Sequence, residues 1–115
     1  MRKVTREIVQ SWARGDCRTV GNTCTNGEAI FLHGHGIAWK GLEPDEIVLT
    51  LAGWNTVTTR ERLNGVLNFY GMDYRFAQRN WEPVLIIGRD VIDIGEHEHV
   101  FFNIATQRLC DPVTG

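Results

Sequence analysis

Two turn signals on either side of one short apolar stretch most restrict what this chain can fold into. Asn26-Gly27 favours a hairpin with a type I′ turn, because both residues tolerate the positive φ angles that this turn requires. Residues 28–33 then predict a strand, and His33-Gly34-His35-Gly36 predicts a second reversal before a partner strand over residues 37–40. The chain therefore contains antiparallel β structure.

The register of the second hairpin follows from where its apolar side chains fall. With Gly34-His35 as the two loop residues, the apolar side chains of both strands share one face, whereas a His35-Gly36 loop would divide them. Gly34 at the first loop position suits a type II′ turn. We therefore expect His35 at the tip of the hairpin. In this register the facing pairs are Leu32 with Ile37 and Ile30 with Trp39.

Two amphipathic segments predict short helices. Over residues 5–14, Ile8 and Trp12 continue the four-residue spacing that begins at Val4, and Gly15 supplies a left-handed end. Over residues 58–70, Thr58 and Glu61 form a capping-box pattern. An apolar stripe follows in this second segment, made of Leu63, Val66, Leu67 and Tyr70.

The remaining segments complete an α+β fold. Residues 47–51 alternate as a third strand of an antiparallel meander, and four further strands are expected near residues 74–79, 84–87, 91–94 and 100–105. Residues 16–25 look loose and only partly extended. We predict a single domain over residues 1–115, in which two short helices pack on an antiparallel sheet made of the meander and the C-terminal strands, with a frayed tail from about residue 106.

Composition narrows the functional class. The net charge of −2 argues against a dedicated nucleic-acid binder, and no apolar run is long enough to span a membrane. Residues 1–7 carry positive charge without an apolar stretch behind them, so they do not predict a secretory signal. Three cysteines, an odd number, are typical of free thiols in a reducing compartment (Cys17, Cys24 and Cys110). We therefore expect a cytoplasmic protein that binds no membrane.

The histidines suggest a metal site as one alternative. His33 with His35 and His97 with His99 are two His-x-His pairs, and residues at i and i+2 of a strand point to the same side. With a carboxylate such as Asp93 or Glu98, a divalent metal bound by His33, His97 and His99 could support a metal-dependent enzyme. A zinc site of Cys17, Cys24, His33 and His35 has suitable ligand types but a wide cysteine spacing. The hairpin register puts His35 in the turn, so the main prediction includes no cofactor.

A second candidate site combines tryptophan with arginine. Trp54 and Trp81 each lie next to a turn, near three arginines in sequence (Arg60, Arg62 and Arg79). These side chains can form a contact surface for a protein or for single-stranded bases. The alternative is that both tryptophans close the ends of the core. No Gly-x-Ser-x-Gly, P-loop or dinucleotide motif is present, which favours a protein that is not an enzyme.

The order of several short motifs resembles a family of small uncharacterised proteins encoded by tailed bacteriophages. The resemblance covers about residues 5–65, and His35 stands where the family pattern suggests asparagine. It rests on Gly21-Asn22-Thr23, Asn26-Gly27, Leu32-His33-Gly34 with Ile37-Ala38, Ala52-Gly53-Trp54, and the Thr-x-x-Arg-Leu-Asn pattern of residues 59–64.

A phage origin, which is all that the resemblance implies, favours a small accessory protein. We expect it to bind a host or phage macromolecule in the cytoplasm of the host cell, in host takeover or counter-defence, without catalysing a reaction. A protein is the expected partner, nucleic acid is a further possibility, and the metal-dependent enzyme is the other alternative. The sequence leaves open the identity of the partner and the oligomeric state.

Overall fold

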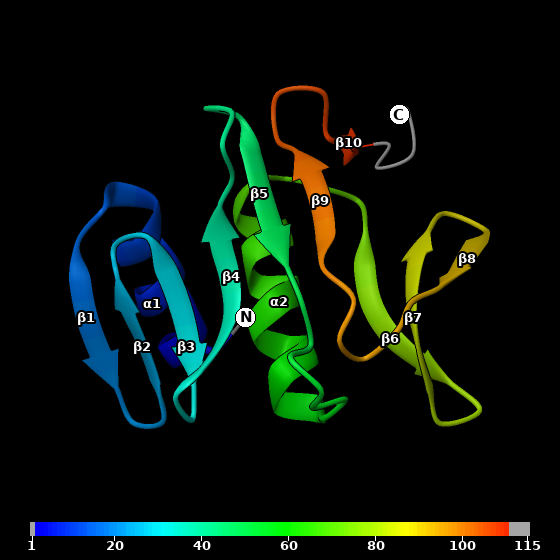
Figure 1. Cartoon of the computed structure of the whole chain (residues 1–115), viewed down its shortest axis with the longest axis horizontal. Helices are drawn as coiled ribbons and strands as arrows, with labels where there is room; N and C mark the ends of the chain where they lie inside the picture. The colour runs from blue at the N-terminus through cyan, green and yellow to red at the C-terminus, as the bar shows by residue number, and fades with distance from the viewer. Residues whose placement is uncertain (1, 111–115) are drawn as a thin grey trace.

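The computed structural model describes residues 2–110. Two helices and ten strands are present in this part of the chain, and the strands form two antiparallel sheets (Figure 1). The α+β class is confirmed. Helices α1 (Lys3–Arg14) and α2 (Val57–Phe69) pack against one face of the larger sheet.

The larger sheet has seven strands in the order β1-β2-β3-β4-β5-β9-β10. The meander is confirmed and is longer than expected, because residues 16–25 form the hairpin β1–β2 instead of a loose segment. All of β1 except Val20 is exposed, so the strand lacks the alternation that would have marked it. The strands are β1 (Cys17–Val20), β2 (Thr23–Asn26), β3 (Ala29–Leu32), β4 (His35–Lys40), β5 (Glu46–Leu49), β9 (Val100–Asn103) and β10 (Arg108–Leu109).

The smaller sheet is a three-stranded meander of β6 (Arg75–Arg79), β7 (Glu82–Ile87) and β8 (Asp90–Asp93). Its edge strand β6 lies against α2, where the side chain of Asn64 takes the place of a neighbouring strand. Asn64 Nδ2 donates to the Phe76 carbonyl at 3.0 Å, and the Phe76 amide donates to Asn64 Oδ1 at 2.7 Å. These two bonds satisfy polar groups that an unpaired edge would expose.

The helix ends differ in part from expectation. Gly15 ends α1 at a φ of 81°, as its position predicts. The prediction of a Thr58–Glu61 capping box is wrong. Thr56 is the N-cap of α2, and its hydroxyl accepts a hydrogen bond from the Thr59 amide at 3.1 Å. The Glu61 carboxylate instead accepts hydrogen bonds from Thr5 and Arg62, which outcompete a return to the helix start.

Both expected hairpins form, but each turn differs from its expected type. Only Gly27 of Asn26-Gly27 has a positive φ, at 92°, because the Asn26 side chain itself accepts from the amides of Glu28 and Ala29. Gly34-His35 is the wrong loop: Leu32 pairs with His35, so the loop is His33-Gly34. The expected pairs Leu32 with Ile37 and Ile30 with Trp39 are wrong as well. Ile30 pairs with Ala38, and a bulge at Ile37 lets Ile37 and Ala38 both lie in the core, whereas Trp39 pairs with Ala29 and is only half-buried.

One hydrophobic core joins both helices to both sheets. Trp12 is fully buried within it, as its helical spacing predicts, and Phe76 and Leu85 extend it into the smaller sheet. The prediction of a frayed tail is wrong for Arg108 and Leu109, which pair with β9 as β10. Residues 111–115 lie outside the described part of the chain.

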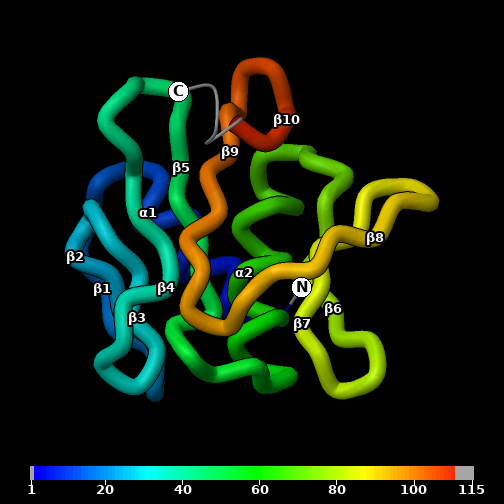
Figure 2. The backbone as a smooth tube through the Cα atoms, turned by 45° about the vertical axis from the view of Figure 1, so that its right-hand side comes forward, coloured from blue at the N-terminus to red at the C-terminus, as the bar shows by residue number. Residues whose placement is uncertain are grey.

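Three connections gather at one end of the molecule. Figures 1 and 2 show the β3–β4 turn, the 50–56 segment that leads into α2, and the β6–β7 turn at this end. The β4–β5 turn lies at the opposite end. His33, Trp54 and Trp81 therefore lie at the same end of the molecule, each in one of these three connections.

Candidate functional site

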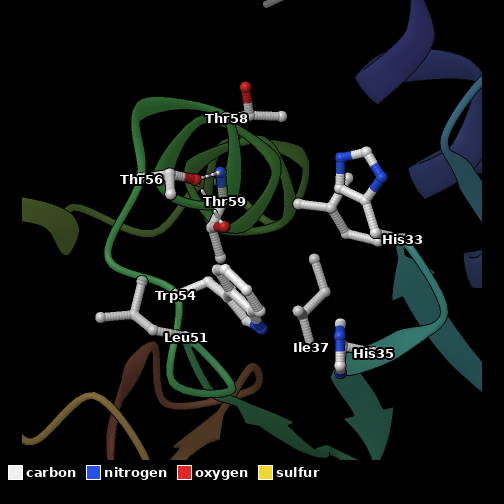
Figure 3. A pocket seen from close by; sticks show the side chains of 9 residues that line it. His33, His35, Ile37, Leu51, Trp54, Thr56, Thr58 and Thr59 are labelled. Atoms are coloured by element: carbon white, nitrogen blue, oxygen red, sulfur yellow. Dashed lines mark hydrogen bonds between the residues drawn. The ribbon is translucent and has the colours of Figure 1, made fainter.

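A cavity of about 480 Å³ lies between the β3–β4 turn, the 50–56 segment and the first turn of α2 (Figure 3). Its inner surface is apolar, formed by Leu32, Ile37 and Leu51, which are all almost fully buried. The remaining lining residues are two histidines, one tryptophan and three threonines, namely His33, His35, Trp54, Thr56, Thr58 and Thr59. We refer to this cavity as the Trp54 pocket.

Aromatic side chains form the walls of the Trp54 pocket. The indole of Trp54 is 54% exposed, and its ring centroid lies 5.6 Å from that of His35 at an interplanar angle of 43°. Figure 3 shows His33 on the other side of the cavity from Trp54. The hydroxyls of Thr56 and Thr59 lie 2.9 Å apart and are used in the cap of α2.

A chain of hydrogen bonds connects His33 to the core. Arg62 Nε donates to Thr23 Oγ1 at 3.0 Å, and the Thr23 hydroxyl donates to Asn22 Oδ1 at 2.8 Å. Because Oδ1 accepts, the Asn22 amide nitrogen faces His33 Nε2, at 3.3 Å. An amide nitrogen can only donate, so Nε2 accepts and the hydrogen of the ring lies on Nδ1. The chain of hydrogen bonds therefore links buried Arg62 to a histidine of the pocket.

The structure corrects the expectation that Arg62 belongs to an exposed contact surface. Arg62 is only 6% exposed. It donates to Thr5 Oγ1 at 2.8 Å and pairs with the carboxylate of Glu61. Burial alone would raise the pKa of Glu61, but hydrogen bonds from Thr5, the Arg2 amide and Arg62 hold it below its ordinary value of 4.5. Arg62 holds α1, β2 and α2 together.

Trp81 lies at the tip of the β6–β7 hairpin and is 85% exposed. Arg79 pairs with Glu82, so the loop is Asn80-Trp81, with φ angles of 53° and 67°. Two positive φ angles are the pattern of a type I′ turn. Arg79 is exposed beside the turn, whereas Arg60 is turned toward the 50–56 segment and donates to the Asn55 carbonyl at 3.3 Å.

The family of the chain follows from a family model described as Kyanoviridae Gp96 protein, which matches residues 1–106. The chain belongs to this phage protein family. The predicted resemblance to small proteins of tailed phages is confirmed. No curated protein and no solved structure matched the chain. Within residues 2–110, no helix is long and apolar enough to cross a membrane.

The histidines of the proposed metal site occupy separate environments. His33 lies at the Trp54 pocket, and the ring of His99 stacks on Trp39 at 5.5 Å. The ring of His97 packs over Gly53, where a β-carbon would lie 2.5 Å from His97 Cε1. In the described residues, no three His, Cys, Asp or Glu side chains lie close enough to bind one metal ion, and the three cysteines are free thiols.

The structure divides the predicted tryptophan–arginine surface into four environments. Trp54 belongs to the pocket, Arg60 to the contact with the 50–56 segment, Trp81 with Arg79 to the hairpin tip, and Arg62 to the core. Both tryptophans are too exposed to close the ends of the core. Sequence reasoning marked His33, His35 and Trp54 but did not join them, because no local pattern reports a contact between two separate segments.

Proposed function

We propose that this protein is a non-enzymatic phage accessory protein that binds a host or phage protein through the β6–β7 turn, with Trp81 as the anchoring side chain. Its role would be host takeover or counter-defence. The proposal rests on the combination of a positive φ and an 85% exposed indole at Trp81.

The backbone of the turn disfavours a large side chain at this position. A bulky residue at positive φ is a conformational outlier, and the left-handed conformation costs about 1–2 kcal/mol relative to a relaxed residue. Asn-Gly is the preferred pair for a type I′ turn, and Asn80 already supplies the first of these residues. Glycine at position 81 would therefore satisfy the turn better than tryptophan does.

The fold gains little from Trp81 in return. With 85% of its surface exposed, the indole contributes little to the core. A residue that violates a local rule without a compensating contact is a candidate for function. Tryptophan is enriched among the residues that dominate protein interfaces, where it fills a pocket of the partner. The turn thus presents the kind of side chain that a partner protein would bury.

The charges around the tip support a protein as the partner. Arg79 and Glu82 flank the turn with opposite charges, and the whole chain has a net charge of −2. Nucleic-acid affinity depends mainly on contacts between cationic side chains and phosphates. A mixed surface provides few such contacts, so we propose a protein partner and treat nucleic acid as a distinct outcome of the test.

The experiment compares wild type with Trp81→Gly and Leu42→Ser. Leu42 is the matched control, because it is 100% exposed and lies in the β4–β5 turn at the opposite end of the molecule. Each variant is used to capture partners from nuclease-treated host lysate, and the captured protein is then purified and titrated. We expect wild type and Leu42→Ser to bind alike, and Trp81→Gly to lose affinity by about 30-fold, as for an interface hot spot.

Equal affinity of Trp81→Gly and wild type for the purified partner would contradict the proposed anchor. A parallel capture from untreated lysate completes the test: a partner that is captured there but lost after nuclease treatment, with an affinity that falls steeply with salt, would identify nucleic acid instead. Folding is not a confounding factor, because glycine suits the backbone at position 81.

A further inference from the structure

We propose that the Trp54 pocket binds a nucleobase, that is, an uncharged planar heteroaromatic ring with hydrogen-bonding edges. This site is separate from the Trp81 turn, and its function does not depend on the partner proposed above. Four features of the pocket support the assignment: its size, its aromatic wall, its polar groups and its lack of charged side chains.

The size and inner surface of the pocket suit a small ring system. A volume of about 480 Å³ lies within the range of roughly 300–1,000 Å³ for small-molecule sites. Leu32, Ile37 and Leu51 offer only aliphatic surface at the bottom of the cavity. A flat ring with one apolar face can displace water from this surface without leaving a polar group unsatisfied.

Trp54 supplies a stacking surface. Its indole packs against the ring of His35 at an interplanar angle of 43° and stays 54% exposed, so part of its surface is free for a ligand. Stacking on such a ring is available to every base, because each base has a π face. A partly exposed aromatic wall beside an apolar cavity is the arrangement that stacking requires.

The polar groups at the rim favour a heteroaromatic ring over a hydrocarbon. His33 and His35 are the polar side chains of the lining that the α2 cap does not use, apart from Thr58. Because Nε2 of His33 accepts from Asn22, Nδ1–H remains as the donor edge of this ring. A ring nitrogen or carbonyl of a base is an acceptor suited to that donor.

The absence of charged side chains from the lining favours a base without phosphates over a nucleic-acid strand. None of the nine lining residues is Asp, Glu, Lys or Arg. A nucleic-acid strand would bring phosphates that this lining cannot neutralise, and its affinity would come mainly from such contacts. A free nucleoside and a single-stranded oligonucleotide share the base, however, so the experiment includes both.

The test is a ligand titration of the full-length protein. Adenosine, guanosine, cytidine and thymidine are titrated by calorimetry, and saturation-transfer NMR reports which ligand protons contact the protein. We expect at least one nucleoside to bind with a Kd on the order of 10⁻⁴ M, the affinity typical of ligand efficiencies at this size. Saturation transfer should be stronger to the base protons than to the ribose protons.

Variants separate the pocket from the rest of the surface. Trp54→Ala should weaken nucleoside binding by about tenfold or more, and Trp54→Phe should retain most of the affinity, because phenylalanine still stacks. Trp81→Gly is the matched control and should leave nucleoside affinity unchanged. Conversely, Trp54→Ala should retain the protein partner that Trp81→Gly loses, so the two proposals fail independently. Amide NMR spectra of each variant verify that the fold is intact.

Each remaining outcome decides the proposal. Binding of an oligothymidylate, when it is lost in Trp54→Ala, supports the base site with a strand as the source, whereas binding of nucleosides alone supports a free ligand. Three results would overturn the proposal. They are the failure of nucleosides and oligonucleotide to bind, unchanged affinity in Trp54→Ala, and binding of N-acetyl-tryptophanamide without any nucleoside, which would assign the pocket to an aromatic side chain of a protein.

Discussion

The two tight turns at one end of the molecule have similar φ angles, but their second loop residues differ: one is glycine and the other is tryptophan. The β3–β4 turn uses His33 and Gly34, with φ angles of 51° and 81°, and the β6–β7 turn uses Asn80 and Trp81, with φ angles of 53° and 67°. The first turn has glycine where the backbone requires it and directs a histidine to a pocket. The second places an exposed tryptophan at the equivalent position.

The difference between these turns indicates that they have different roles: one is held in place by the core, and the other exposes a side chain to solvent. Gly34 follows the conformational rule of its turn, and His33 is connected to buried Arg62 through Asn22 and Thr23. Trp81 breaks the rule and contributes little to the core. Both hairpins depend on α2, the first through Arg62 and the second through Asn64. We infer that the first turn shapes a pocket and the second presents a contact.

The largest expected effect tests the connection between the β3–β4 turn and the core. Arg62→Ala should destabilise the fold by about 3 kcal/mol, because it leaves Glu61 without its ion-pair partner and removes the donor to Thr23. Arg60→Ala removes a half-buried arginine of the same helix that donates to Asn55, without leaving an ion-pair partner behind, and should cost only about 1 kcal/mol. Urea denaturation measures both. Equal losses in the two variants would contradict the structural role of Arg62.

The second prediction makes the β3–β4 turn resemble the β6–β7 turn. Gly34→Ala should destabilise the protein by about 1 kcal/mol, since alanine disfavours the positive φ. A β-carbon at this position meets no atom within 4 Å, so steric contact adds nothing to the effect. The measurement is the shift in thermal midpoint, and an unchanged midpoint would show that this turn tolerates a side chain without strain.

The third prediction makes the β6–β7 turn resemble the β3–β4 turn. Trp81→Gly should stabilise the fold by about 0.5 kcal/mol, because relief of the left-handed strain exceeds the entropy that glycine adds to the unfolded chain. Chemical denaturation of wild type and variant measures the change. A loss of stability would mean that the indole contributes to the fold, which would remove the main support for its role as a contact.

The smallest expected effect is a pH dependence of stability that comes from Glu61, the ion-pair partner of Arg62. The pKa of Glu61 is lower in the folded protein than its ordinary value of 4.5, so the ionised carboxylate stabilises the fold above that pH. This contribution decreases as the pH falls from 4.5 through the folded pKa. The difference in unfolding free energy between wild type and Glu61→Gln should therefore shrink on acidification. A difference that stays constant with pH would argue against the lowered pKa.

Local sequence patterns predicted most elements but few of their details. The second helix and the hairpins follow from periodicity and turn residues, yet the loop of the β3–β4 hairpin is shifted by one residue. A period of two cannot anticipate a bulge, and the bulge at Ile37 buries Ile37 and Ala38 in succession while it turns Trp39 to the other face. Thr56 and Thr58 are equally good N-caps by type, so only the path of the 50–56 segment decides between them.

The candidate sites show the same limit. Trp81 was recognisable as a candidate because it adjoins a turn, but its positive φ depends on the two-residue loop that Arg79 and Glu82 close. Arg62 looks like a surface residue of an amphipathic helix. It is buried because Thr5 of α1 and Thr23 of β2 supply acceptors for its guanidinium group. The pairing of Trp54 with His35 is visible only in the folded chain.

The sequence by itself determined the α+β class, the antiparallel meander, the two helices and the likeness to tailed-phage proteins. These features depend on preferences within a few neighbouring residues, such as turn chemistry and hydrophobic spacing. Only the tertiary structure decided that His33, His35 and Trp54 share a pocket, that Arg62 lies in the core and that Trp81 is exposed. Those outcomes depend on how separate segments pack, because a side chain's burial and partners come from residues that are distant along the chain.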